Sequence, residues 1–395
     1  MIDRPSHPPP TASRGIVKFS RSRGLPAHSV AQVVIHIVRC NHSRFQDLFR
    51  LKNGVKTSGF QFTAAQPSER AAVGEFLFSV FKDPLLTGAD LLQWKYFDER
   101  EDWPGSRSYI LKRGEKILAH GGVDPVTLCT PRGEVSSIHG SDWAAAPSAP
   151  GVGILLLQNV AKLADIYLVP GGTGQTRLIL PEIGFQSFGE RYTYSRVVRP
   201  WQHMRAERSP GWKSPLRLGR NWVRNLAPRS STMGWSSVPL ASFGDAELPL
   251  LERGPNPHSI RCRRTPSVLN YLLRCPVAAV SAFLLVRGTQ PEGYYILSRV
   301  GNQVRIADLS LNSDSAADWR AGYSLAAQTA AADSTVCEVL TAVSTEVARE
   351  ALASNRFRLL DRRTVLVLDR KGLLEDAPHI DLQLLDGDEF YLHSD

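Results

Sequence analysis

The sequence has few cysteines and no long apolar run, and both absences narrow its function. Its 395 residues contain five cysteines, scattered singly and never in a C-x-x-C pair. This pattern argues against a disulfide framework and a zinc site, so we expect no metal. The apolar run at residues 277–286 is about half the roughly 20 residues that a membrane-spanning helix needs. Residues 30–38 are apolar but lack a small-residue cleavage site, so we expect no signal peptide and a cytoplasmic protein.

Positive charge is concentrated in two segments. Residues 1–60 contain ten Lys or Arg against two Asp, and residues 196–229 contain nine Lys or Arg against one Glu. The whole chain carries a net charge of +9, so the remainder is net acidic. A basic tail and a basic middle segment do not make a basic face on a folded domain, which argues against nucleic-acid binding.

Length and pattern predict an α+β chain with two folded domains. A prior of about 150 residues per domain allows two domains and a tail. Residues 1–56 form a basic leader rich in Pro, Ser and Arg, which we expect to be disordered. Residues 57–200 form the first domain and residues 261–395 repeat its order of elements in reduced form. Residues 201–260, rich in Pro, Trp and Arg, are expected to be a linker.

Apolar periodicity places the elements of both domains. In the first domain we expect helices at 68–81, 89–94, 151–164 and 176–183, and strands at 108–111, 117–120, 134–143, 165–169 and 192–198. In the second we expect strands at 278–287, 293–299, 304–309, 335–340 and 364–369, and helices at 318–331 and 345–353.

The most informative segment is the loop before the helix expected at 151–164. It contains Gly151 and Gly153, which let the backbone approach a phosphate at the unpaired first N–H groups of a helix. A G-x-G pattern alone fits a tight turn without a ligand equally well. Here it follows a helix and a meander of strands, and Gly184-Phe185 comes about 30 residues later.

This combination resembles the GNAT superfamily of acyl-CoA N-acyltransferases. In that family a Q/R-x-x-G-x-G/A loop after the central strand holds the coenzyme A pyrophosphate, and a G-F pair ends a later helix. Gly151 and Gly153 match the motif glycines, Gly184-Phe185 matches the pair, and Ser148 stands where the family has Gln or Arg. The resemblance implies two GNAT-like domains, each a mixed, largely antiparallel sheet flanked by helices, with acetyl-CoA or another acyl-CoA as co-substrate. The residues expected to contact the coenzyme are Trp143, Ala144, Ser148, Gly151, Val152, Gly153 and Ile154.

The second domain resembles the first in the order of its elements and not in its motif. Where the phosphate loop would fall, it has Asp314 and Asp318 and no glycine. Two carboxylates would repel a pyrophosphate. We therefore expect a degenerate copy that does not bind acyl-CoA.

The family reaction, direct attack of an amine on the thioester, needs a base, an oxyanion donor and an acid. The central strand offers Glu134, His139 and Asp142 as the base. In a regular strand His139 and Asp142 point to opposite faces, so only one of them would reach the site. The helix before Gly184 contains no tyrosine to protonate the thiolate. Tyr192 or Tyr194 is the substitute, although each also fits a half-buried strand position.

The acceptor is the least constrained part of the prediction. Trp94, Tyr96 and Trp103 are candidates for an acceptor pocket, or else for the core. The segment 92–98 resembles superfamily members associated with bacterial envelope or polysaccharide genes, which implies a sugar or envelope precursor.

The leading prediction is an N-acyltransferase, with acetyl as the expected group, acting on an amine of a small molecule or sugar. One alternative is a catalytically inactive acyl-CoA-binding or interaction protein with two degenerate GNAT folds. The other is a membrane or nucleic-acid binder that uses the basic tail and linker. Arg217, Arg220 and Arg224 on a linker helix would then make a weak peripheral membrane contact, unless that helix only packs between the domains.

Overall fold

The computed structural model describes residues 59–206, 218–219, 232, 234–252, 259–375 and 379–392. The predicted leader and most of the predicted basic linker helix, with its proposed membrane contact, lie outside these residues. Within them, no helix combines the length and the apolar character needed to cross a membrane.

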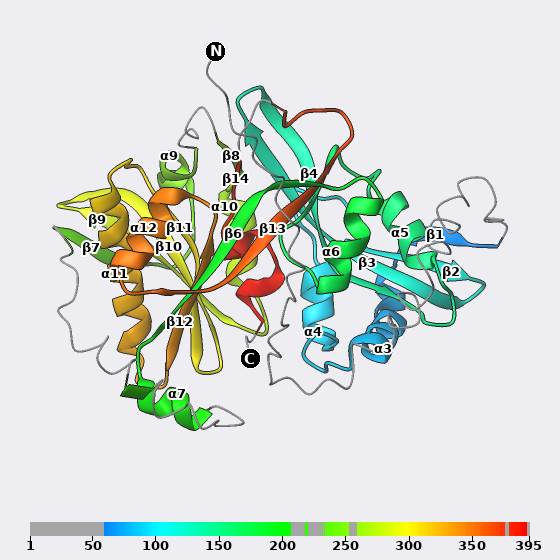
Figure 1. The fold of residues 1–395 in the computed structure, drawn as a ribbon, viewed down its shortest axis with the longest axis horizontal. Helices are drawn as coiled ribbons and strands as arrows, with labels where there is room; N and C mark the ends of the chain where they lie inside the picture. Colours follow the sequence, from blue (N-terminus) through cyan, green and yellow to red (C-terminus); the bar gives the residue numbers. More distant parts are fainter. Residues whose placement is uncertain are drawn as a thin grey trace, which may run out of the picture.

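One mixed sheet runs through the molecule and connects two lobes (Figure 1). The strands of the first lobe are β1 (Gln61–Ala64), β2 (Ser108–Arg113), β3 (Lys116–Thr130), β4 (Gly133–Ala145), β5 (Ile166–Val169) and β6 (Gln186–Val197). The strands of the second are β7 (Trp235–Leu240), β8 (Ile260–Cys262), β9 (Ala279–Arg287), β10 (Gln290–Val300), β11 (Gln303–Leu311), β12 (Glu338–Val343), β13 (Arg358–Asp369) and β14 (Ile380–Asp381).

Helices cover both faces of this sheet. In the first half of the chain they are η2 (Pro67–Glu69), α3 (Arg70–Phe81), α4 (Ala89–Leu92), the π-helical turn η3 (Gln93–Phe97), α5 (Val152–Val160), α6 (Gly174–Glu182) and α7 (Pro200–Ala206). In the second half they are η4 (Asp245–Glu247), α9 (Leu248–Leu251), α10 (Pro266–Leu273), α11 (Ala316–Ala332), α12 (Glu346–Ser354), η5 (Leu384–Asp386) and η6 (Asp388–Phe390).

The order of strands is nearly symmetric about the centre of the sheet. It runs β1-β2-β3-β4-β5-β13-β6-β12-β11-β10-β9-β7, and along this path only β4–β5 and β11–β12 are parallel pairs. The late strand β13 lies between β5 and β6, while β6 also pairs with β12 of the second lobe. The last long strand of each lobe, β6 in the first and β13 in the second, therefore lies at the junction and pairs with a strand of the other lobe.

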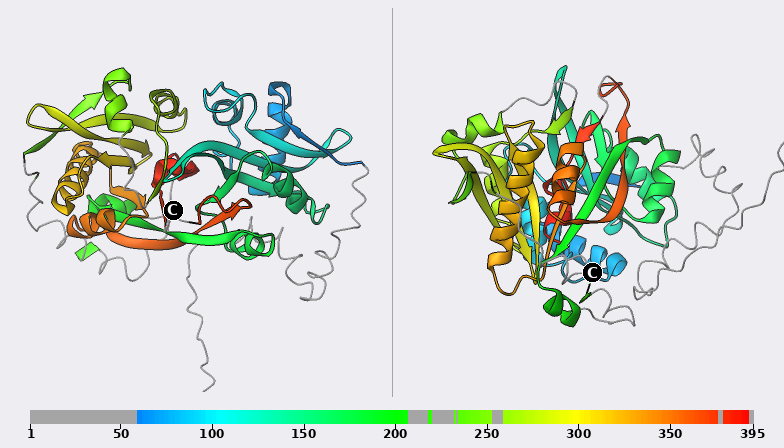
Figure 2. Two further views of the ribbon diagram at one scale, coloured as in Figure 1. Left: turned by 90° about the horizontal axis from the view of Figure 1, so that it is seen from above. Right: turned by 60° about the vertical axis from the view of Figure 1, so that its left-hand side comes forward.

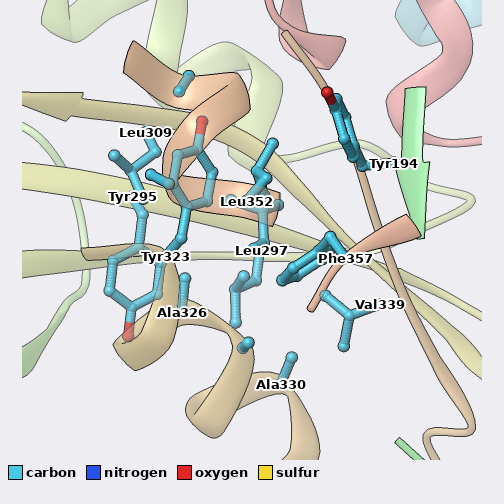
Figure 3. Packing of buried hydrophobic residues seen from close by; sticks show 14 of the residues in the cluster. Tyr194, Tyr295, Leu297, Leu309, Tyr323, Ala326, Ala330, Val339, Leu352 and Phe357 are labelled. Atoms are coloured by element: carbon cyan, nitrogen blue, oxygen red, sulfur yellow. The ribbon is translucent and has the colours of Figure 1, made fainter. Parts of the chain in front are cut away.

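The core of the second lobe lies between the sheet and helices α11 and α12 (Figure 3). Small residues such as Ala326 and Ala330 on α11 let the helix approach Tyr295 and Leu297 on β10 closely. The alanine-rich sequence of α11 thus explains both its helix propensity and its tight packing.

A separate core fills the space between the lobes. Trp94 of η3 packs there against Tyr271 of α10 and against Phe390 and Tyr391 near the C-terminus. The C-terminal segment, drawn in red, lies between the two lobes (Figures 1 and 2). Side chains of η3, of α10 and of the C-terminal segment, which are far apart in the sequence, thereby enclose the region beside β3 and β4.

The region expected to be a linker contains regular structure. Trp235–Leu240 within it forms β7, which pairs with β9 at the edge of the sheet. Pro239 is compatible with an edge strand, where one side of the backbone needs no partner.

Candidate functional site

Strands β4 and β5 separate in the middle of the first lobe. They pair only over Ser137–His139 with Ile166–Leu168, whereas β4 continues to Ala145. Just past the separation, Asp142 and Trp143 together lie opposite the single β3 residue Gly121, because the register shifts there. This is a β-bulge, a feature that redirects side chains. Asp142 adopts the left-handed conformation, with φ of 44°.

The bulge overturns the expectation that Asp142 and His139 point to opposite faces. That expectation assumed a regular strand, and the extra residue breaks the alternation. Asp142 bonds to Lys95, whose ammonium also reaches Asp388, while His139 lies near Asp386. Both β4 side chains therefore point toward the C-terminal segment.

A buried network surrounds Asp142. The Lys95 Nζ lies 2.9 Å from Asp142 Oδ2, and these side chains are 3% and 7% exposed. The Tyr96 hydroxyl donates to the same oxygen, and His120 Nδ1 lies 3.0 Å from the Asp142 carbonyl oxygen. Burial alone would raise the pKa of Asp142, but the ammonium of Lys95 and the hydrogen bonds from Lys95 and Tyr96 outweigh it, so this pKa is lowered.

His139 and Asp388, near the bulge, also have shifted pKa values. Burial lowers the pKa of His139 to about 4, so its ring is neutral at pH 7, and neither ring nitrogen has a hydrogen-bond partner among the described residues. Burial, with the nearby charge of Asp142, raises the pKa of Asp388 to about 6 against the opposing effect of Lys95. Asp388 is thus the carboxylate of this group that changes charge nearest to neutral pH.

The predicted phosphate loop leads into α5, and both of its glycines have structural reasons. Gly151, the residue before the helix, has φ of 83°, which favours glycine. A Cβ on Gly153 would lie 3.1 Å from Cβ of Ala145 and 3.3 Å from Nε1 of Trp143. Trp143 Nε1 also donates to the Gly153 carbonyl at 3.0 Å. Packing of β4 against the helix therefore accounts for the second glycine without a ligand.

The other residues expected to contact the coenzyme differ in exposure. Ser148 is exposed, Ile154 is partly buried, and Val152 is buried in the core of the first lobe. Ala144 is buried in a cluster with residues of α3. The N–H of Gly153 has no acceptor among the described residues, whereas the N–H groups of Val152 and Ile154 donate to Ala149 and Gly151. One backbone donor of this first helical turn is therefore available to an anion.

Three other candidates lie apart from the group at the bulge. Tyr194 belongs to the core of the second lobe (Figure 3). Its hydroxyl interacts with Arg349. The Tyr192 hydroxyl donates to Glu190 at 2.8 Å. Glu134, at the far end of β4, is half exposed and pairs with Arg263.

The three aromatic residues expected around an acceptor have different positions. Trp94 lines a pocket between the lobes. Tyr96 is fully buried and bonded to Asp142. Trp103 donates to the carbonyl oxygen of Ser106 at 3.4 Å. Of the three, Trp94 is the one placed in the wall of this pocket.

The loop before α11 in the second lobe is acidic, as expected, but its charges are not both available. Asp318 is 6% exposed and accepts hydrogen bonds from Ser313 and Trp235, besides pairing with Arg287. The pairing with Arg287 weakens the repulsion expected from Asp318, and the repulsion of acyl-CoA by this loop stays a prediction. The side chain of Asp318 is buried at the first turn of α11. Asp314, in the loop before it, is exposed.

Sequence reasoning missed Lys95, His120 and Asp388. Lys95 is a lysine between two aromatic residues, and Asp388 belongs to an acidic cluster in an otherwise apolar tail. A charged residue among apolar neighbours is unusual, and this is the signal in the sequence that could have marked Lys95 and Asp388 as functional candidates. No local pattern links either residue to β4.

The fold defines the class of protein: the chain has the GNAT fold, and the predicted fold class is confirmed. It is similar to a GCN5-related N-acetyltransferase from Anabaena variabilis, at 12% identity and a TM-score of 0.51, over 78% of this chain and 72% of that one. A second such enzyme, from Kribbella flavida, matches at 13% identity and 0.50, over 82% and 75%. N-myristoyltransferase of Saccharomyces cerevisiae, solved with bound myristoyl-CoA, matches at 11% identity and 0.52, over 79% and 83%. No protein-family model and no curated protein matches the sequence.

Proposed function

We propose that the chain is an acyl-CoA-dependent N-acyltransferase of the cytoplasm, with acetyl-CoA as the expected donor and a small-molecule or sugar amine, such as an envelope precursor, as acceptor. The observation that carries the proposal is the separation of β4 from β5 at a bulge that holds a buried carboxylate, next to the first turn of α5. In this proposal the thioester lies where the two strands separate.

In this proposal the pyrophosphate lies at the start of α5, over Gly151 and residues 152–154, with the N–H of Gly153 as its backbone donor and Ser148 at the rim. The helix dipole and the N–H of Gly153, which has no acceptor among the described residues, favour the anion. The thioester lies beside the bulge, where backbone N–H groups of β4 beyond its pairing with β5 can stabilise the oxyanion.

Proton removal from the acceptor falls to the carboxylates near the bulge. Asp142 is held as an anion by Lys95 and Tyr96, which suits an electrostatic role more than proton exchange. A base works best when its pKa lies near the working pH. We therefore assign the base to Asp388, whose pKa is about 6, with His139 beside the reacting atoms as a neutral partner.

The test combines acetyl-CoA binding with thiol release in the presence of an amine panel. Gly151→Val should abolish binding measured by calorimetry, because a side chain blocks the approach to the helix. Gly114 has φ of 58° in an open hairpin turn, so Gly114→Val is a control that also places a side chain at positive φ, away from the site. An equal loss of acetyl-CoA affinity in both variants, or an unchanged affinity in Gly151→Val, would show that the pyrophosphate does not bind at the start of α5. Binding without thiol release from any amine would favour an inactive acyl-CoA-binding protein.

A further inference from the structure

A pocket lies between the two lobes on the side of β3 and β4 that carries His139. It holds about 80 Å³ and is lined by residues of both lobes and of the C-terminal segment, among them Trp94, Asp124, Tyr271 and Tyr391. We infer that this pocket binds the positively charged amine of a cationic acceptor and disfavours anionic acceptors.

The cations in the pocket wall are already used by carboxylates. Four cations line the pocket. Arg264 bonds to Asp308 and Asp386, and Arg100 makes two hydrogen bonds to Asp102, of 2.8 and 2.6 Å. Lys95 pairs with Asp142 and Asp388, and Arg263 pairs with Glu134. Little positive charge remains to hold an anionic ligand. When the carboxylates paired with the wall cations are included, acidic groups outnumber basic ones here, so the pocket disfavours carboxylates and phosphates.

Asp124 is the wall carboxylate with the weakest compensation. Its closest cation is Arg100, at 3.8 Å, and its side chain is 26% exposed. Arg100 is engaged more closely by Asp102. An ammonium entering the pocket can therefore pair with Asp124 without displacing an existing short ion pair.

A second feature of the wall points to a ligand. The hydroxyl of Tyr391 is buried and has no hydrogen-bond partner among the described residues. Buried polar atoms are nearly always paired, so an orphan in a pocket wall suits a bound group. Trp94, whose ring stacks on Tyr271 with centroids 5.3 Å apart, adds aromatic surface of the kind that attracts cations. The ring of Tyr271 is already in contact with three arginines of the protein.

The position of the pocket ties it to the reaction proposed above, on which this role in acceptor binding rests. Asp124 on β3 is the direct cross-strand neighbour of His139 on β4, so the two side chains share one face of the sheet. That face also carries Asp142 and Asp388 around Lys95. An amine held by Asp124 thus lies on the side of the sheet where the base is proposed.

The experiment uses butylamine and butyrate, which are similar in shape and opposite in charge, titrated into the full chain without coenzyme and followed by ligand-observed NMR. Butylamine should bind and butyrate should not. Asp124→Asn should weaken butylamine binding about fivefold, as expected for one partly exposed ion pair, and Tyr391→Phe should weaken it by a smaller factor. Asp165→Asn removes a surface carboxylate paired with Lys371 and should change nothing.

Equal binding of butyrate, or equal affinity in Asp124→Asn and Asp165→Asn, would overturn the inference. Tyr391→Phe keeps it testable if the Asp124 variant does not fold, because an unchanged affinity in that variant also counts against the pocket. Since no coenzyme is present, these outcomes are independent of acetyl-CoA binding. Failure of the enzyme proposal and failure of the pocket are therefore distinguishable.

Discussion

Replacing Lys95 by Met should destabilise the protein in a strongly pH-dependent manner. Lys95 and Asp142 are both buried and their charged atoms are 2.9 Å apart. At an effective dielectric constant of about 20, their attraction is worth about 6 kcal/mol. Methionine has a similar length and no charge, so the variant leaves Asp142 as an unpaired buried anion.

Protonation of Asp142 limits the damage. Converting a carboxyl of ordinary pKa, about 3.9, to its neutral form costs about 4 kcal/mol at pH 7 and about 1.5 kcal/mol at pH 5. In the variant the folded-state pKa of Asp142 is raised above its unfolded value, so stability falls as pH rises between these values. We expect Lys95→Met to lower the free energy of unfolding by about 3–4 kcal/mol at pH 7 and by clearly less at pH 5.

Urea unfolding at both pH values measures this, and a second substitution controls it. Asp142→Asn in the Lys95→Met background should restore most of the loss at pH 7, because the unpaired charge is gone and Asn tolerates the left-handed backbone at this position. A loss below about 1 kcal/mol at pH 7, or one that does not change with pH, would refute the reasoning.

Three further predictions concern single side chains. His139→Leu should stabilise the protein by about 2 kcal/mol more at pH 5 than at pH 7 in urea unfolding, because the unfolded histidine gains a proton below about pH 6.5 while the folded one, with pKa about 4, does not; equal effects at both pH values would contradict this. Asp388→Asn should lower kcat about 100-fold or more and remove the fall of kcat/KM below about pH 6, whereas a retained acidic limb would exclude Asp388 as the base. Asp314→Lys should leave the acetyl-CoA stoichiometry near one per chain by calorimetry. A second binding site in this variant would show that the charge of the exposed Asp314 alone prevents acetyl-CoA from binding to the second lobe.

Local periodicity was sufficient to locate most elements. Apolar residues at helical spacing predict a helix over 151–164, and α5 occupies Val152–Val160. The helix expected over 318–331 is α11, Ala316–Ala332. The strand expected over 192–198 is longer in the structure, because β6 begins at Gln186 with residues that show no alternation of apolar and polar side chains.

The parts that could not be predicted depend on contacts between distant residues. The bulge at Asp142 is a property of the pairing of β4 with β3, and β4 alone carries no signal for it. The contact between Lys95 and Asp142 joins residues 47 positions apart, and the contact between Lys95 and Asp388 joins residues 293 positions apart. The site residues predicted on β4 and before α5 came from a motif, and their roles stay predictions.

The position of β13 between β5 and β6 has a consequence for how the protein is made. While the ribosome has synthesised only the first lobe, β5 has an unpaired edge where β13 will later bind. Open strand edges are prone to pair with other chains. The nascent first lobe therefore cannot complete its sheet until Asp369 has left the ribosome, and we expect the lobes to fold together, late and slowly, because the closing contacts join distant parts of the chain. A fragment of residues 57–200 would lack this strand and should aggregate instead of folding as an independent enzyme.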